Sequence, residues 1–145
     1  MSAHLRTMTR DDVRAVSTIE EALFEHDPWS PELFHLELDE VPATRRVMVA
    51  VVDGVVAGYA SLRFVPPEGD VNTIAVSTPV QGRGIGRQLM DWLESEAYGL
   101  GVRQLFLEVR SDNVPALALY EGRGFERIDR RRDYYGSRSE EHTSE

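Results

Sequence analysis

The sequence predicts a single α/β domain built around a mixed β-sheet. Strand-like and helix-like segments alternate in the order β-α-α-β-β-β-α-β-α-β, so the sheet begins as an antiparallel meander and helices then interrupt it. A glycine-rich stretch at 81–86 leads directly into a helix-forming run. The 145 residues show no internal repeat and no linker, and they suffice for one domain with its own core.

The N-terminal part of the chain predicts one short strand and two helices. Residues 4–9 have the length and alternation of a strand, and apolar residues recur at helical spacing through 11–24. Ser30 is a good N-cap and Pro31 suits the first helical position, so a second helix is expected to follow.

The middle of the chain predicts an antiparallel meander. Two runs rich in β-branched residues flank Asp53 and Gly54, and this dipeptide between apolar runs favours a hairpin turn. The run at 70–76, DVNTIAV, predicts a further strand. The glycine-rich stretch therefore lies between the end of this strand and the next helix.

Two helices and two strands complete the predicted domain. The long helix is expected to end near Tyr98, and a strand through 102–110 places Glu108 on the face opposite its apolar residues. A short helix through 111–124 and a final strand through 125–135 follow.

Composition excludes several kinds of site. The chain has no cysteine, which excludes disulfides, thiolate metal ligands and a cysteine nucleophile. Its four histidines lack metal-ligand spacing, so no metal is expected. All 16 basic side chains are arginine, so any side-chain cation that binds an anion is a guanidinium.

Charge and hydropathy limit the partners. A net charge of −9 argues against a general nucleic-acid-binding protein, and it either favours a basic partner or serves only solubility. No apolar run approaches the ~20 residues that a membrane span needs. The N-terminus has no apolar signal region, so a cytoplasmic protein without a membrane partner is expected.

The segment QGRGIG predicts an anion site. Gly82, Gly84 and Gly86 allow the backbone to approach a ligand closely, and the first N–H groups of a helix have no partners within it. The positive end of the helix dipole and the side chains of Arg83 and Arg87 add to the attraction. A phosphate or pyrophosphate is the expected ligand, because a plain turn at the strand–helix corner needs neither three glycines nor two arginines.

Two common phosphate loops do not fit this segment. A P-loop requires a lysine, which the chain lacks. A dinucleotide fingerprint requires G-x-G-x-x-G in the first strand–helix unit, whereas here Arg87 stands at the third glycine position and several strands precede it.

QGRGIG resembles the Q/R-x-x-G-x-G/A signature of the GCN5-related N-acetyltransferase (GNAT) family, whose loop and helix start hold the pyrophosphate of acetyl-coenzyme A (acetyl-CoA). NTIAV before it, LEVRSDNVPALALYEGRGF after it, RRRDYY near the end and PWS at 28–30 resemble the RimI-type ribosomal-protein-alanine N-acetyltransferases in order and spacing. The detailed match covers about residues 68–135. The resemblance implies a GNAT fold, a central mixed sheet flanked by helices, as one domain over residues 1–135.

The resemblance also implies roles for individual residues. Glu108 is expected to be the general base, directly or through water, and Tyr120 the general acid for the coenzyme A thiolate. The alternatives are an ion pair between Glu108 and Arg110 and a core position for Tyr120. Contacts to acetyl-CoA are implied for Ile74, Ala75, Val76, Gly82, Arg83, Gly84, Ile85, Gly86, Arg87 and Asn113. Contacts to the acceptor are implied for Trp29, Tyr134 and Tyr135, with a core position as the alternative for Trp29.

The chain departs from the family pattern after its YY pair. The family continues with a strand that inserts between the two preceding ones, whereas this chain continues as GSRSEEHTSE. RSEEHTSE resembles a translated sequencing adapter, so the natural coding sequence is expected to end near Gly136. Residues 136–145 are therefore expected to be a polar tail, disordered or not natural, and the last family strand is expected to be missing.

The leading hypothesis is an enzyme that transfers the acetyl group of acetyl-CoA to the N-terminal α-amine of a protein by direct attack in a ternary complex. The resemblance implies an N-terminal alanine of a small-subunit ribosomal protein as the acceptor. Two alternatives stay open: acetylation of a small amine or of lysine, and acetyl-CoA binding without catalysis.

Overall fold

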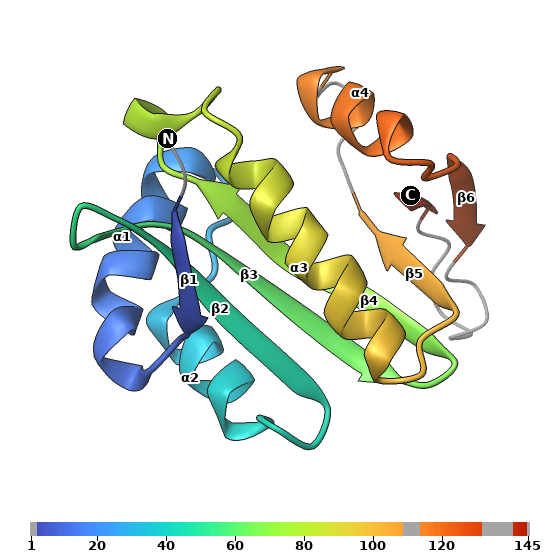
Figure 1. Ribbon diagram of the computed structural model, residues 1–145, viewed down its shortest axis with the longest axis horizontal. Helices are drawn as coiled ribbons and strands as arrows, with labels where there is room; N and C mark the ends of the chain where they lie inside the picture. Colours follow the sequence, from blue (N-terminus) through green and yellow to red (C-terminus); the bar gives the residue numbers. More distant parts are fainter. Residues whose placement is uncertain (1–2, 109–113, 132–140, 145) are drawn as a thin grey trace.

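A computed structural model describes residues 3–108, 114–131 and 141–144 (Figure 1). Five strands form its main sheet in the order β1-β2-β3-β4-β5. Neighbouring strands are antiparallel except β4 and β5, which run parallel. The predicted mixed sheet is therefore confirmed. The strands are β1 (His4–Thr7), β2 (Arg45–Val52), β3 (Val55–Val65), β4 (Glu68–Val76) and β5 (Gln104–Leu107).

Helices cover both faces of this sheet. The long helix α3 crosses one face, while α1 and α2 pack on the other, and α4 lies beside β5 (Figure 1). Two short 3-10 helices, η1 and η2, precede α1 and the glycine loop. Their bounds are η1 (Arg10–Asp12), α1 (Val13–Leu23), α2 (Pro31–Asp39), η2 (Thr78–Val80), α3 (Ile85–Gly99) and α4 (Val114–Gly122).

Each face of the sheet has its own hydrophobic cluster. Leu89, Met90 and Leu93 recur three and four residues apart on α3 and are fully buried against the sheet. On the opposite face, Phe34 of α2 stacks edge-on against Tyr59 of β3 with ring centroids 5.7 Å apart. The two clusters hold β4 rigidly between α3 and the α1–α2 pair.

Local sequence signals account for two element boundaries. Asp53 and Gly54 both have positive φ, 51° and 79°, and they link β2 to β3 as the Asp-Gly dipeptide predicts. Ser30 caps α2, because its Oγ accepts a hydrogen bond from the N–H of Leu33 at 3.2 Å, and Pro31 is the first helical residue.

The C-terminal segment differs from its expectation. Strand β6 (Ile128–Arg131) pairs antiparallel with β7 (Glu141–Ser144), and β7 also contacts β5. The polar tail thus supplies a strand next to β5 and β6, where the last family strand was expected to be missing. Strand pairing uses backbone N–H and C=O groups, so a short polar segment is able to form it.

Candidate active site

The glycine loop joins β4 to α3 and has the backbone of an anion site. Gly84 is the N-cap of α3 with φ +86°, and Gly82 has φ +81°, a region that favours glycine. No side chain among the described residues caps this helix. The N–H groups of Ile85, Gly86 and Arg87 therefore point out of the first turn without intrahelical partners, at the positive end of the dipole.

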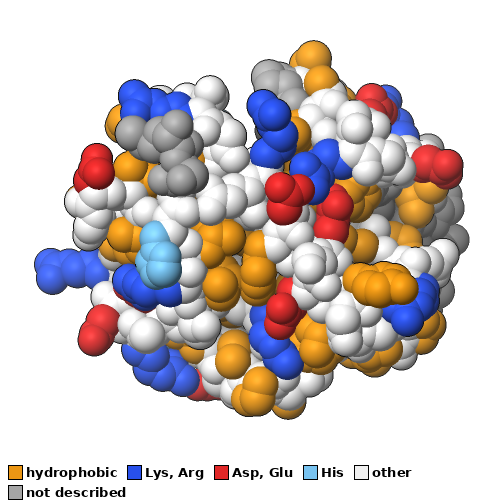
Figure 2. Space-filling model, viewed as in Figure 1, with side chains coloured by type: hydrophobic (Ala, Val, Ile, Leu, Met, Phe, Trp, Pro, Cys, Tyr) orange, Lys and Arg blue, Asp and Glu red, His pale blue; other side chains and the backbone are white. Residues whose placement is uncertain are grey.

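Some side chains of the glycine loop pack or bond within the protein, and others are exposed to solvent. Ile85 is buried and fixes the helix start, while the Gln81 Nε2 donates to the backbone oxygen of Val76 at 2.9 Å. Arg83 and Arg87 are exposed, as a phosphate site requires. Figure 2 shows arginine side chains gathered over the start of α3, beside a notch that separates this end of the molecule from α4.

Strand β4 separates from β5 next to this loop. It pairs with β3 along its whole length, but with β5 only as far as the pair of Val71 with Leu107. Among the described residues, no strand pairs with the second edge of β4 beyond that point. Ile74, Ala75 and Val76 lie in this stretch of β4; the backbone oxygen of Val76 accepts a hydrogen bond from Gln81, and that of Ala75 faces Gly58 of β3.

A cavity of about 590 Å³ lies where the two strands separate. Glu108 after β5, Tyr120 of α4, Trp29 between α1 and α2, and Ile74 of β4 all line it. The structure thus brings together the predicted base, the predicted acid, one predicted acceptor contact and one predicted acetyl-CoA contact. Trp29 also packs against Phe34 with centroids 5.2 Å apart, so it lies between the cavity and the hydrophobic cluster on that face of the sheet.

The cavity wall is acidic. Four carboxylates, from Glu20, Glu25, Asp27 and Glu108, line it together with His26, and no arginine does so among the described residues. Such a wall attracts a protonated amine and repels an anion. No three described His, Asp or Glu side chains are grouped to hold a metal ion, and no described helix has the length and hydropathy to cross a membrane.

Glu20 is a cavity residue that sequence reasoning missed. It is 3% exposed; its Oε2 accepts from the N–H of Trp29 at 3.0 Å, and its Oε1 accepts from the hydroxyl of Tyr59. Burial first, and the Glu20 carboxylate second, raise the pKa of Tyr59, which therefore stays protonated as the donor. The available signal was a carboxylate within the apolar stripe of α1, four residues after Val16.

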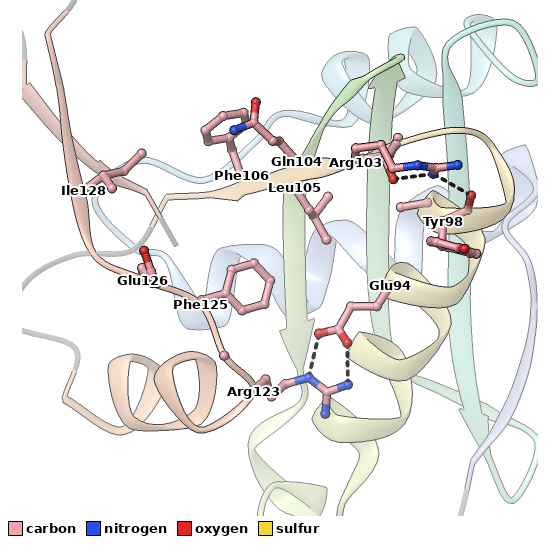
Figure 3. Close-up of a pocket in the computed structure, with 13 residues that line it drawn as sticks. Glu94, Tyr98, Arg103, Gln104, Leu105, Phe106, Arg123, Phe125, Glu126 and Ile128 are labelled. Atoms are coloured by element: carbon pink, nitrogen blue, oxygen red, sulfur yellow. Dashed lines mark hydrogen bonds and ion pairs between the residues drawn. The ribbon is translucent and has the colours of Figure 1, made fainter.

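Tyr120 enters the site from α4, which a clamp ties to α3. Tyr120 is 7% exposed as a residue, and its ring lies edge-on to Phe125 with centroids 6.2 Å apart. Arg123, just after α4, binds the carboxylate of Glu94 on α3 (Figure 3). Figure 3 also shows Phe125 pointing into a second pocket of about 540 Å³ between α3, β5 and the segment after α4.

The comparisons with known proteins agree with this geometry. The profile of the acetyltransferase (GNAT) family matches residues 13–125. The chain belongs to this family. It is 42% identical over 133 residues to the N-alpha-acetyltransferase RimI of Mycobacterium tuberculosis, covering 88% of this chain and 81% of that protein.

Two solved structures have folds similar to that of this GNAT protein. The ribosomal-protein-S18-alanine N-acetyltransferase from Escherichia coli superposes with a TM-score of 0.80 at 30% identity, covering 98% of this chain and 90% of that one. A GNAT phosphinothricin acetyltransferase from Sinorhizobium meliloti in complex with acetyl-CoA superposes with a TM-score of 0.79 at 22% identity, over 99% of this chain and 86% of that one. The second likeness concerns the fold alone.

The predicted family and fold are thus confirmed. Of the predicted residues that the structure describes, Gly82 to Arg87 form the loop, Ala75 and Val76 end β4 before it, and Trp29, Ile74, Glu108 and Tyr120 line the cavity. Asn113, Tyr134 and Tyr135 lie outside the described residues, as does Arg110, the alternative ion-pair partner of Glu108.

Proposed function

We propose that this GNAT protein transfers the acetyl group of acetyl-CoA to the N-terminal α-amine of a protein, with an N-terminal alanine of a ribosomal protein as the acceptor. The observation that carries the proposal is the cavity at the β4–β5 separation. It joins Glu108 and Tyr120 to the unpaired edge of β4, and that edge runs into the glycine loop. Acceptor, thioester and pyrophosphate then have adjoining places in one continuous site.

The loop and the strand edge bind the nucleotide and pantetheine parts. The N–H groups at the start of α3 and the exposed Arg83 and Arg87 suit the pyrophosphate. Backbone groups of Ile74, Ala75 and Val76 suit the pantetheine amides and the thioester oxygen, which gains negative charge during transfer. This placement brings the thioester next to the cavity that Glu108 and Tyr120 line.

Three proton transfers accompany the reaction. Glu108, directly or through one water, takes a proton from the α-ammonium, and the free amine attacks the thioester carbon. The new C–N bond forms as the C–S bond breaks, and Tyr120 donates its phenolic proton to the departing thiolate. The attacking nitrogen then gives up its second proton, which returns through water to the Tyr120 phenolate, and the amide is left neutral. A phenol with a pKa near 10 keeps its proton at neutral pH and so is a suitable acid. Direct attack needs no acyl-enzyme, which agrees with a chain that has no cysteine.

The acceptor assignment draws on the acidic wall and on the relatives. Glu25, Asp27 and Glu108 suit a protonated N-terminus better than a neutral or acidic group. The Mycobacterium tuberculosis relative is named as an N-alpha-acetyltransferase, and the Escherichia coli structure is named as an enzyme for ribosomal protein S18. The proposal applies those acceptor classes to this chain.

A matched set of peptides tests the acceptor. The set comprises an Ala-start peptide, the same peptide with a formylated N-terminus and an internal lysine, and a small polyamine, each assayed by release of free thiol. An α-amine with a pKa of ~7.7–8 is roughly a hundredfold more neutral near pH 7 than a lysine with a pKa of ~10.4. We expect the free Ala-start peptide to react fastest. Faster reaction of the blocked peptide or of the polyamine would favour a lysine or small-amine acetyltransferase instead. If none of the three acceptors releases thiol, the protein binds acetyl-CoA without catalysis.

A further inference from the structure

Glu37 is a buried carboxylate that the proposed reaction does not use. It lies on α2 with 8% of its surface exposed. Its oxygens accept hydrogen bonds from Arg45 Nε of β2 at 2.8 Å, Ser61 Oγ of β3 at 2.5 Å and Asn72 Nδ2 of β4 at 3.2 Å. One side chain thus ties α2 to three neighbouring strands.

Asn72 occupies an irregular position in β4. Ser61 of β3 faces Thr73 and the next residue of β3 faces Val71, so Asn72 is an extra residue in β4, a β-bulge. A bulge bends its strand and increases the local twist. Val71, directly before Asn72, is also the last residue of β4 that pairs with β5.

The bulge and the opening of the sheet therefore coincide. The pairing of β4 with β5 ends at Val71, and the next three residues of β4, Asn72, Thr73 and Ile74, line the cavity. The side chain of Asn72 is bonded on the α2 side of the sheet, where its Nδ2 donates to the Glu37 carboxylate. A bulge that lost this partner would be free to shift toward regular pairing, which narrows the opening.

We propose that Glu37 is a positioning residue that acts through Asn72, and that their hydrogen bond fixes the opening between β4 and β5 in which acetyl-CoA binds. The inference rests on the proposed function, because the opening matters only if acetyl-CoA enters it. Arg45 orients the Glu37 carboxylate through an ion pair at 2.8 Å, and Ser61 holds it over β3. Arg45 lies on β2 away from the bulge, and Ser61 faces Thr73 beside it, but only Asn72 is the extra residue.

Two single substitutions separate positioning from stability. Asn72→Ala and Ser61→Ala each remove one neutral donor from the same carboxylate and leave its ion pair with Arg45 intact. Each variant loses one neutral donor to the same carboxylate, so both should melt at similarly lowered temperatures. We expect the KM for acetyl-CoA to rise about tenfold in Asn72→Ala and less than about twofold in Ser61→Ala, because only the first releases the bulge.

An exchange of donor and acceptor separates this link from direct contact between Asn72 and acetyl-CoA. Asn72→Asp places two carboxylates together and should raise the KM more than Asn72→Ala does. Adding Glu37→Gln to Asn72→Asp lets the new amide donate to the new carboxylate, which should restore most of the acetyl-CoA KM. Direct contact with the ligand predicts no such rescue.

The outcomes distinguish the two proposals. Wild-type protein is first tested for a rise in melting temperature with acetyl-CoA, and absence of that rise overturns the proposed function together with this inference. A wild-type rise with equal KM values for Asn72→Ala and Ser61→Ala overturns the inference alone, as does failure of the double variant to improve on Asn72→Asp.

Discussion

The guanidinium of Arg123 holds the carboxylate of Glu94 in a two-point grip. Nε donates to Oε2 at 2.8 Å and Nη2 to Oε1 at 3.2 Å (Figure 3). Nη2 also donates to Asp91 Oδ1. The hydrogen bond to Glu94 is the largest of the causes that raise the pKa of Arg123. The backbone N–H of Arg123 donates to the backbone carbonyl oxygen of Tyr120 at 3.0 Å. The ion pair with Glu94 therefore holds α3 to the turn that follows the proposed acid, Tyr120.

Breaking this clamp should reduce turnover through Tyr120. Small displacements of a reacting group are costly, so we expect Arg123→Gln to lower kcat about tenfold with little change in the KM for acetyl-CoA. The reversed pair, Arg123→Glu with Glu94→Arg, should recover part of the loss, as steady-state kinetics would reveal. Glu96→Gln is the control, because Glu96 pairs with Arg46 at 3.3 Å and so links α3 to β2 instead. If Glu96→Gln lowers kcat as much as Arg123→Gln does, the effect comes from a general loss of ion pairs on α3 and not from the position of Tyr120.

Gly84→Asp should abolish the acetyl-CoA-dependent rise in melting temperature. The substitution adds a negative charge at the start of α3 in a backbone with φ +86°. Gly54→Asp is matched, because Gly54 has φ +79° and, like Gly84, no atom within 4 Å of an added Cβ, but it lies in the β2–β3 turn. A preserved rise in Gly84→Asp, or an equal loss in Gly54→Asp, would contradict a phosphate site at the loop.

Local signals in the sequence predicted most of the elements. The Asp53-Gly54 turn, the Ser30 cap with Pro31 and the glycines before α3 each act within a few residues, so the chain alone reveals them. Local patterns could not show that Glu108 and Tyr120 lie near each other. The GNAT resemblance predicted a shared site for them, and both line the same cavity.

Contacts between distant residues could not be predicted. Glu20 meets Tyr59 across 39 positions of the chain, and Glu37 meets Asn72 across 35, because sheet order and helix packing decide both. Strand β7 was missed for a related reason. Its polar sequence gives no hydrophobic pattern, and only pairing with β6 makes it a strand.

Gly58→Ala should weaken acetyl-CoA binding from the far side of β4. An added Cβ would lie 2.9 Å from the backbone oxygen of Ala75, a contact that only a shift of β4 relieves. Such overpacking typically costs about 1–3 kcal/mol, so the melting temperature should fall as well. Isothermal titration with acetyl-CoA measures the loss of affinity. Gly99→Ala at the end of α3 meets no atom within 4 Å and should bind normally.

Asp12→Asn should remove an acid-dependent part of the stability. Hydrogen bonds from Arg6 at 2.7 and 2.8 Å, the largest cause, lower the pKa of Asp12 to about 2. A lowered pKa adds stability above the unfolded value near 3.9, and this is lost as the pH falls toward 2. Arg6 is partly exposed, so screening reduces the contribution to about 1 kcal/mol.

Urea unfolding at several pH values measures this effect. Wild-type stability should exceed that of Asp12→Asn at pH 7, and the two should converge only below pH 2, where the folded wild type is also protonated at Asp12. Asp11→Asn removes one charge from the adjacent exposed residue and controls for net charge. A constant difference between wild type and Asp12→Asn at every pH would show that the ion pair with Arg6 contributes nothing that depends on protonation.

Glu108→Gln should lower turnover most at low pH. Loss of a positioned base costs typically 10²–10⁴-fold, so we expect a fall of about a hundredfold at pH 7. The deficit should shrink at pH 9, because an α-amine with a pKa of ~7.7–8 is then neutral without help. The measurement is the pH profile of kcat with the Ala-start peptide, together with the acetyl-CoA melting shift, which should be unchanged. Glu25→Gln removes a second carboxylate from the same cavity and should keep its turnover. If Glu25→Gln loses as much turnover as Glu108→Gln, the cavity contributes negative potential and Glu108 is not the base.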